Sequence, residues 1–259
     1  MKMPIAYVVA TLALAAATSG HAASPDKALV WRDYTDTVAP ADQQAYEAGV
    51  KAFNQCLGEH HVKFSMPTVV HETGNDYQYS SVVGPVTWAD MDTLSAEIKP
   101  CDATWRAQGN PHLKGETSAF MVLQPELSHL PADWQSRPNP PMLFITYFTL
   151  KPGHEHNMAF SDTFKKVAAA ASKSKWPYYW SIMQIWGGGD GAPDYILVIQ
   201  KKNWADVGTE PNPAPWKMMA NTYGQSDADA IRKSLGDAIE KSSDHYDRYD
   251  ASLSYIAGK

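Results

Sequence analysis

The pattern of apolar and polar positions predicts one order of elements in the first half of the chain. Short apolar runs predict three strands, at residues 28–34, 68–73 and 77–83. After the first run, Pro40 opens a helix whose apolar side chains recur on one face, namely Tyr46, Val50, Phe53 and Leu57. A second helix is expected over residues 89–98, because Pro100 then ends it. The first half therefore predicts strand, helix, two strands and helix.

The second half repeats this order. Its predicted strands cover residues 142–150, 178–186 and 195–201, and the glycine-rich segment 187–191 joins the last two as a hairpin. The helix after the first strand buries Phe160, Phe164, Val167 and Ala171. A final helix is expected from Ser226, capped with Asp229, with one side made of Ile231, Leu235, Ala238, Ser242 and Tyr246. Each half closes on a similar tail, residues 126–129 and 252–255.

Short sequence matches between the halves indicate an internal duplication. Trp88-Ala89-Asp90 recurs as Trp204-Ala205-Asp206, and Asp76-Tyr77 recurs as Asp194-Tyr195, with nearly constant spacing. The expected domains are therefore a signal peptide, a first repeat, a proline-rich linker and a second repeat, at residues 1–22, 23–129, 130–141 and 142–259.

A unit of the order β-α-β-β-α-β is ferredoxin-like, with both helices on one face of an antiparallel sheet. The run Ile196 to Ile199 is apolar at consecutive positions, which is typical of a strand buried on both sides. The other face of each sheet then needs a cover. We expect an α+β protein of two tandem ferredoxin-like repeats, packed sheet to sheet as a fused barrel.

This arrangement resembles the dimeric α/β-barrel superfamily, fused into one chain. The local motifs are similar to those of the NIPSNAP branch and the antibiotic-biosynthesis monooxygenases, whose first strand reads Arg-x-Tyr before Pro-Gly. The first half has Arg32 and Tyr34 followed by Pro40-Ala41, and the second has Tyr147 followed by Pro152-Gly153, with Ile145 in place of the arginine. The resemblance implies the fold, and a function among oxygenases, isomerases, haem-handling proteins and domains of unknown role.

The beginning of the chain predicts export. Lys2 is followed by an apolar stretch over residues 5–17 and by small residues at 20–22, as in a cleaved signal peptide. The mature protein is expected to be periplasmic or secreted, without a membrane span.

The charge balance argues against a nucleic-acid partner. The chain carries 22 basic and 28 acidic residues, a formal net charge of -6, and loss of Lys2 with the leader makes it more acidic. Phosphate binding needs clustered lysine and arginine.

Cys56 and Cys101 are the only two cysteines. An oxidising compartment allows them to pair, provided that the first two helices are neighbours on one face of a sheet. Two separate buried thiols are the alternative. Neither cysteine has the C-x-x-C or Cys/His context of a redox or zinc site.

Two sets of residues are candidates for catalysis. His154-Glu155-His156 lies where a strand meets a helix, and either histidine is a candidate general base, although a solvated helix start is the plainer interpretation. Arg32 and Tyr34 share one face of a strand and together suit a carboxylate, phenolate or carbonyl oxygen. An internal ion pair of Arg32 is the alternative.

Aromatic and polar strand residues are candidates for ligand binding. Trp180 and Trp186 lie an even number of positions apart and face one side of their strand, where they either line a cavity or fill a core. Tyr147 and His71 lie on predicted strands as well, and so does the polar Asp33. Polar groups on a sheet covered on both sides need partners, and a partner can be a ligand.

The sequence leaves three functions open. The first is an exported binding protein for a small apolar or aromatic molecule. The second is a cofactor-independent oxygenase or isomerase that uses His154 or His156 as base and Arg32 or Tyr34 to stabilise an oxyanion. The third is a haem protein with an axial histidine. No cofactor is required by the sequence, and the duplicated chain is expected as a monomer or a homodimer.

Overall fold

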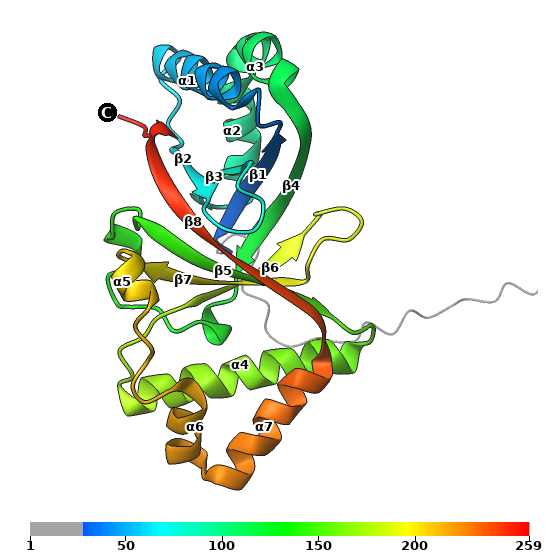
Figure 1. The fold of residues 1–259 in the computed structure, drawn as a ribbon, viewed down its shortest axis with the longest axis vertical. Helices are drawn as coiled ribbons and strands as arrows, with labels where there is room; N and C mark the ends of the chain where they lie inside the picture. Colours follow the sequence, from blue (N-terminus) through cyan, green and yellow to red (C-terminus); the bar gives the residue numbers. More distant parts are fainter. Residues whose placement is uncertain (1–27, 259) are drawn as a thin grey trace, which may run out of the picture.

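The computed structural model describes residues 28–258 and shows one closed antiparallel barrel of eight strands. Around the barrel the strands follow the order β1-β3-β2-β8-β5-β7-β6-β4, with β4 returning to β1. Helices cover the barrel in two groups at opposite ends of the view in Figure 1. The predicted signal peptide, residues 1–22, lies outside the described residues. No helix among the described residues has the length and apolar character needed to cross a membrane.

The first half contains the predicted elements and one strand that the pattern missed. Its main elements are β1 (Val30–Val38), α1 (Gln43–Glu59), β2 (Met66–His71), β3 (Gln78–Val86), α2 (Asp90–Ile98), α3 (Asp102–Gln108) and β4 (Leu113–Leu123). The missed strand is β4, whose first residues are polar and exposed. The predicted tail 126–129 follows β4 and contributes only a short 3-10 turn and an isolated bridge between His129 and Trp180.

The second half differs from its prediction at the end of the chain. Its main elements are β5 (Met142–Leu150), α4 (His154–Ser174), β6 (Ser181–Trp186), β7 (Tyr195–Lys201), α5 (Trp204–Val207), α6 (Pro215–Tyr223), α7 (Gln225–Ala238) and β8 (Ile239–Tyr255). The predicted final helix is too long, because Ser242 and Tyr246 belong to β8. The predicted cap is also wrong, since Gly224 occupies the N-cap of α7 without a side-chain bond.

The two sets of four strands meet at their edges and do not stack as separate sheets. The first set has the order β4-β1-β3-β2 and the second has β8-β5-β7-β6. Antiparallel pairing of β2 with β8 and of β4 with β6 closes the ring. The expectation of two sheets packed face to face is therefore corrected. Closure removes every unpaired edge, which an open pair of sheets would leave exposed.

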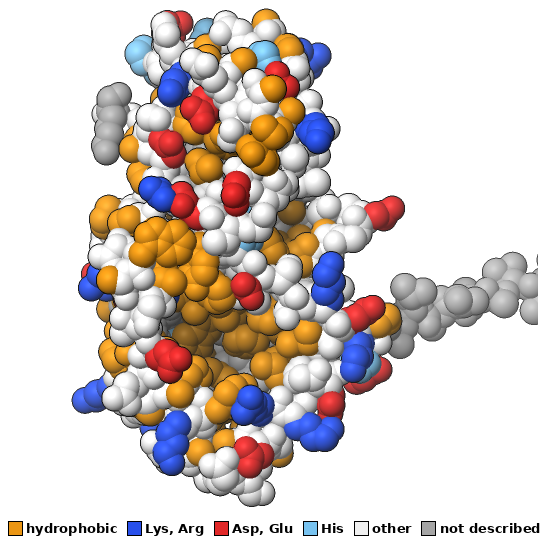
Figure 2. Space-filling model, viewed as in Figure 1, with side chains coloured by type: hydrophobic (Ala, Val, Ile, Leu, Met, Phe, Trp, Pro, Cys, Tyr) orange, Lys and Arg blue, Asp and Glu red, His pale blue; other side chains and the backbone are white. Residues whose placement is uncertain are grey.

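The outward faces of the strands carry the helices. Around β5 to β8, α4 and α7 pack through a cluster that includes Phe160, Phe164, Ile182 and Met219. Around β1 to β4, Tyr46 of α1 packs against Tyr79 of β3, with ring centroids 4.8 Å apart. Apolar side chains also surround a hollow over the region between β7 and α4 (Figure 2).

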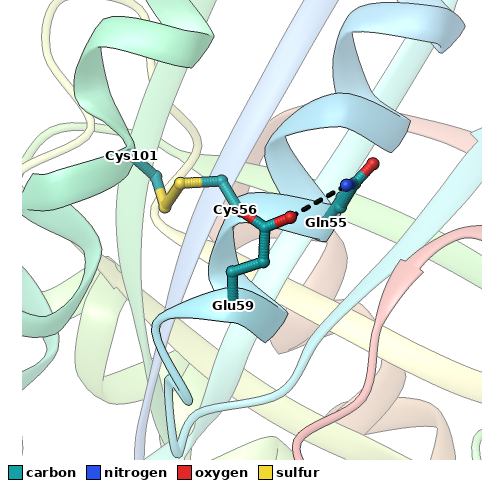
Figure 3. The surroundings of a disulfide bond; sticks show 4 residues. All are labelled: Gln55, Cys56, Glu59 and Cys101. Carbon is teal, nitrogen blue, oxygen red and sulfur yellow. Dashed lines mark hydrogen bonds between the residues drawn. A yellow bond between two sulfur atoms is a disulfide. The ribbon is translucent and has the colours of Figure 1, made fainter.

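Cys56 and Cys101 form a disulfide in the structure. It joins α1 to the short 3-10 turn that follows α2, with the Cα atoms 5.8 Å apart (Figure 3). Both sulfurs lie beside a buried cluster around Leu57 and Val62. The bridge therefore ties the outer helical layer together on this side of the barrel, away from the barrel interior.

The two Trp-Ala-Asp segments lie after β3 and β7, where each begins a helix. The carboxylate of Asp90 accepts a bond of 2.8 Å from the Thr87 backbone N–H, and that of Asp206 accepts one of 2.9 Å from Lys202. Each aspartate thus satisfies a backbone donor next to its helix. These segments are structural, and the site lies elsewhere.

Candidate ligand site inside the barrel

A cavity of about 470 Å³ opens at one mouth of the barrel. Side chains of a barrel strand point alternately inward and outward, so Asp33 and Thr35 of β1 face the cavity. The β2–β3 turn at residues 73–75 and the β6–β7 loop at residues 188–193 form much of its rim. Glycine residues in the sequence permit both loop conformations, because Gly74 and Gly191 adopt positive φ angles that favour glycine.

One wall of this cavity carries the buried His71 and His245, and a third buried ionisable side chain, Asp247, lies beside them. His71 lies opposite Asp247 across the β2·β8 pairing, and His245 lies two residues earlier on β8. The Nε2 atoms of His71 and His245 lie 3.6 Å and 3.0 Å from Oδ1 of Asp247. The two imidazole rings stack with centroids 4.1 Å apart and planes inclined by 18°. We refer to these three residues as the His-Asp-His cluster.

Three polar atoms of the His-Asp-His cluster lack hydrogen-bond partners. Both Nε2 atoms and Oδ1 of Asp247 are buried without a hydrogen-bond partner among residues 28–258, even though they lie close to one another. These atoms lie within contact distance, but they are too poorly aligned for a hydrogen bond. Buried polar atoms of this kind are costly and are usually satisfied by a partner.

Burial changes the acidity of the groups around the cavity. It raises the pKa of the Asp33 carboxyl to about 7, although a hydrogen bond of 3.0 Å from the Thr35 hydroxyl opposes the change. Burial likewise lowers the pKa of the His71 imidazole, against the attraction of Asp247. It raises the pKa of the Tyr147 hydroxyl, and the charges of Asp33 and Asp247 add to that effect.

The opposite wall of the cavity is apolar. Met121 of β4, Ile185 of β6 and Ile196 of β7 line it. Further along the barrel interior these side chains continue into an apolar plug that includes Ile145 and Met183. The cavity therefore presents hydrogen-bonding groups on one side and hydrocarbon on the other.

The rim adds more negative than positive charge. Asp190 and Asp244 line it together with Lys241, and Asp33 lies further inside. An anionic ligand would meet these carboxylates.

The structure brings two of the predicted ligand-binding residues to the cavity. His71 and Tyr147 both line it, and the Tyr147 ring stacks on His245 with centroids 5.4 Å apart. Each occupies an inward position of its strand. The sequence prediction of polar residues on buried strands therefore includes two residues of this cavity.

The two predicted catalytic histidines lie outside the cavity. His154 is exposed at the first residue of α4, and His156 Nδ1 lies 3.0 Å from the Pro152 carbonyl oxygen. Because α4 packs on the outer surface of the barrel, its first turn does not reach the interior. The solvated helix start, the plainer of the two interpretations, describes this placement.

Arg32 and Tyr34 face outward, because Asp33 between them takes the inward position. The Arg32 guanidinium donates a bond of 2.9 Å to the Ser118 hydroxyl and lies 4.4 Å from the centre of the Phe120 ring. No acidic partner pairs with Arg32 among the described residues, so the internal ion pair is not formed. Neither residue reaches a ligand in the cavity.

Trp180 and Trp186 also occupy the outer face of the barrel. Trp180 is buried in the helix-covered cluster, and its Nε1 donates a bond of 3.0 Å to the Leu127 carbonyl oxygen. Trp186 is 47% exposed and stacks on Trp88, with centroids 5.6 Å apart. The alternation of β6 puts Met183 and Ile185 inside instead.

The sequence prediction missed His245 and Asp247, and it counted Asp33 only among the polar strand residues that need a partner. The predicted final helix extended to Tyr246, so it included His245 and ended just before Asp247, and their period-two alternation on β8 went unnoticed. The signal that could have found them is the spacing of His245 and Asp247, which are two positions apart in the segment Ser243 to Tyr249. Residues at this spacing face the same side of a strand.

A second group of potential metal ligands, Cys56, His60 and Cys101, lies on the outer helical layer. Its two sulfurs are bonded to each other and are therefore not thiolate ligands.

The cavity histidines do not fit a haem. An axial imidazole needs space beyond its Nε2 atom for the whole porphyrin. Here each Nε2 faces the Asp247 carboxylate within 3.6 Å, and the two rings cover each other.

Comparison with known proteins gives the fold and no family. No protein-family model matches the sequence, and no curated protein matches it. Among solved structures, a monooxygenase-like protein from Lactobacillus acidophilus NCFM is similar, with a TM-score of 0.52, 8% identity, and coverage of 90% of this chain and 98% of its own. A chlorite dismutase variant from Candidatus Nitrospira defluvii has a TM-score of 0.50, 10% identity, and coverage of 86% and 92%. The fold is thus an α+β barrel similar to that of these two solved structures.

Proposed function

We propose that this protein binds a small molecule inside the barrel, with an apolar or aromatic body and a hydrogen-bonding head. The cavity supports this proposal, because its volume of about 470 Å³ lies in the range of small-molecule sites. Its apolar wall suits the body of such a ligand. The polar side chains on its other wall, among them Asp33 and His71, suit the head.

The charges favour a neutral head that donates a hydrogen bond, such as a hydroxyl group. Asp33, Asp190 and Asp244 outnumber the single Lys241 on the lining. A carboxylate or phenolate would be repelled, and Arg32, which was expected to hold one, faces outward. A hydroxyl group can instead donate to the Asp33 carboxylate, which lines the cavity.

Fluorescence titration with 2-naphthol tests the proposal, because this probe has an aromatic body and one hydroxyl group. We expect saturable binding to the wild type and its loss in Ala119→Phe, which places a ring in the cavity. Ala107→Phe, on the exposed surface of α3, is the matched control and should bind normally. Equal binding by wild type and Ala119→Phe would place the probe elsewhere. Absence of binding, together with no ligand retained on purification, would reject the proposal.

Catalysis on such a ligand is the second candidate, as a cofactor-independent oxygenase or isomerase. It is favoured by Asp33, whose carboxyl faces the cavity and has a pKa of about 7, near the value that suits a general base. The fold similarity to a monooxygenase-like protein is compatible with this candidate but shows the fold alone. Oxygen uptake or isomerisation of a bound naphthol, abolished in Asp33→Asn with binding retained, would support it. Turnover unchanged in Asp33→Asn would remove Asp33 as the base.

We also propose an exported location, in the periplasm or outside the cell. The disulfide between Cys56 and Cys101 supports it, since such bonds persist in oxidising compartments. We further propose that residues 23–129 and 142–259 are NIPSNAP-like copies joined by the linker 130–141. The shared strand order, fourth-first-third-second in each half, supports a duplication.

A further inference from the structure

We propose that His71, His245 and Asp247 bind a divalent first-row transition-metal ion in the wall of the cavity. One atom from each side chain, two Nε2 atoms and one carboxylate oxygen, lies within 4.8 Å of the others. The three residues come from two strands that pair directly, so the rigid barrel holds them together. The inference uses the same cavity as the proposed function but does not depend on the organic ligand.

The distances are close to those that a metal requires. Ligand bonds of about 2.1 Å place neighbouring ligand atoms about 3.0 Å apart in an octahedral site and about 3.4 Å apart in a tetrahedral one. The two distances to Asp247 Oδ1 are 3.0 Å and 3.6 Å. Little movement of the carboxylate is therefore needed.

The imidazole rings must turn to complete the site. A metal lies in the plane of each ligating ring, whereas the two planes are now inclined by only 18°. No hydrogen bond of these atoms opposes the rotation of the rings, because both Nε2 atoms and Oδ1 lack a hydrogen-bond partner among the described residues. The binding of a cation would convert three unsatisfied atoms into ligands, and loss of the ring stack is its structural signature.

The ligand set selects the class of metal. Two imidazoles and one carboxylate suit zinc, iron or cobalt, whereas calcium and magnesium prefer oxygen ligands alone. His71 and His245 also line the cavity, so the remaining coordination positions of the metal would face the space for a ligand. This arrangement is that of an open metal site, with three protein ligands.

Metal titration of the exported protein, stripped with a chelator, tests the inference. We expect one equivalent of Co²⁺ to give visible d–d bands, and Zn²⁺ to displace it and raise the Tm. In His245→Ala and Asp247→Asn, affinity should fall by about 100-fold or more, since loss of even an outer-shell partner costs about 10–100-fold. Asp244→Asn, on the same cavity rim, and His60→Ala, on the exposed helical layer, are matched controls and should keep wild-type affinity.

Circular dichroism distinguishes variants that lose the site from variants that lose the fold. The cobalt spectrum of the wild type tests metal binding even if a variant does not fold. The inference is overturned if the wild type binds neither Co²⁺ nor Zn²⁺, or if Asp247→Asn binds as tightly as Asp244→Asn. Zinc binding without 2-naphthol binding would reject only the proposed organic ligand. Naphthol binding by a protein that takes no metal would reject only this inference.

Discussion

Two seams close the barrel, and they differ in chemistry although their geometry corresponds. At the β2·β8 seam, His71 lies opposite Asp247. At the β4·β6 seam, Ile185 lies opposite Met121. All four side chains point into the barrel, but the first pair belongs to the His-Asp-His cluster and the second pair to the apolar wall.

The apolar seam shows what the fold needs at this position. Hydrocarbon side chains close that seam and fill the barrel beside it, so ionisable groups are not required for closure. Replacement of buried charged groups by well-packed hydrocarbon is often neutral or stabilising. The cluster at the β2·β8 seam is therefore best explained by what it binds.

Charging the apolar seam should give the largest effect. Met121→Asp places a carboxylate where Met121 is 9% exposed and its neighbours are Ile145, Met183 and Ile196. An unpaired buried charge costs about 3–5 kcal/mol, so we expect that loss in the free energy of unfolding, measured with urea at pH 8. Met121→Leu is the size-matched control. A loss below 1 kcal/mol would show that this wall is more open to water than the structure indicates.

Making the polar seam apolar should act in the opposite direction. The triple variant His71→Ile, His245→Leu and Asp247→Met copies the character of the β4·β6 seam. Replacement of buried polar side chains by apolar ones in this way is expected to raise the free energy of unfolding by about 0 to 4 kcal/mol. Urea unfolding measures the gain, and cobalt titration should show loss of binding. A strongly destabilised triple variant would contradict the comparison, since the cluster would then be structural.

A third substitution compares the Asp247 carboxylate, which points into the barrel, with the Asp36 carboxylate, which points outward. Asp36 on β1 is as buried as Asp247, but its Oδ2 accepts a bond of 2.7 Å from the Tyr46 hydroxyl of α1. Burial raises the pKa of Asp36 to about 7, and Glu116 adds to the rise. Since this pKa exceeds the unfolded value, the ionised group destabilises the fold. The contribution of Asp36 to stability is therefore most favourable below about pH 4 and falls as the pH rises to about 7.

Asp36→Asn keeps an acceptor for Tyr46 and removes the charge. We expect little change at pH 4 and a gain on the order of 1 kcal/mol at pH 8, or a Tm higher by about 2–4 °C. Thermal unfolding across this pH range provides the measurement. Parallel curves for wild type and variant would show that Asp36 does not titrate in this range.

The sequence predicted the scaffold better than the cavity, for a physical reason. Helical periodicity in α1 and α4 and the apolar runs of β5 and β7 are local signals, and they gave the correct elements. β8 carries few apolar residues before Leu253, so its first residues were assigned to the helix that ends at Ala238. His245 and Asp247 became visible as a site only when strand pairing brought them to His71, a contact between distant parts of the chain.

Substitution of an exposed histidine at the start of α4 should have the smallest effect on stability and binding. His154 and His156 lie near each other in the sequence and were candidates for catalysis, whereas His71 and His245 are distant in sequence and stack in the fold. His154→Ala should change the free energy of unfolding by less than about 0.5 kcal/mol, as for other surface substitutions. Naphthol and cobalt titrations of this variant should match those of the wild type. Loss of naphthol or cobalt binding in this variant would show that the start of α4 contributes to the site. His154 can influence the cavity only if that helix end moves toward the barrel mouth.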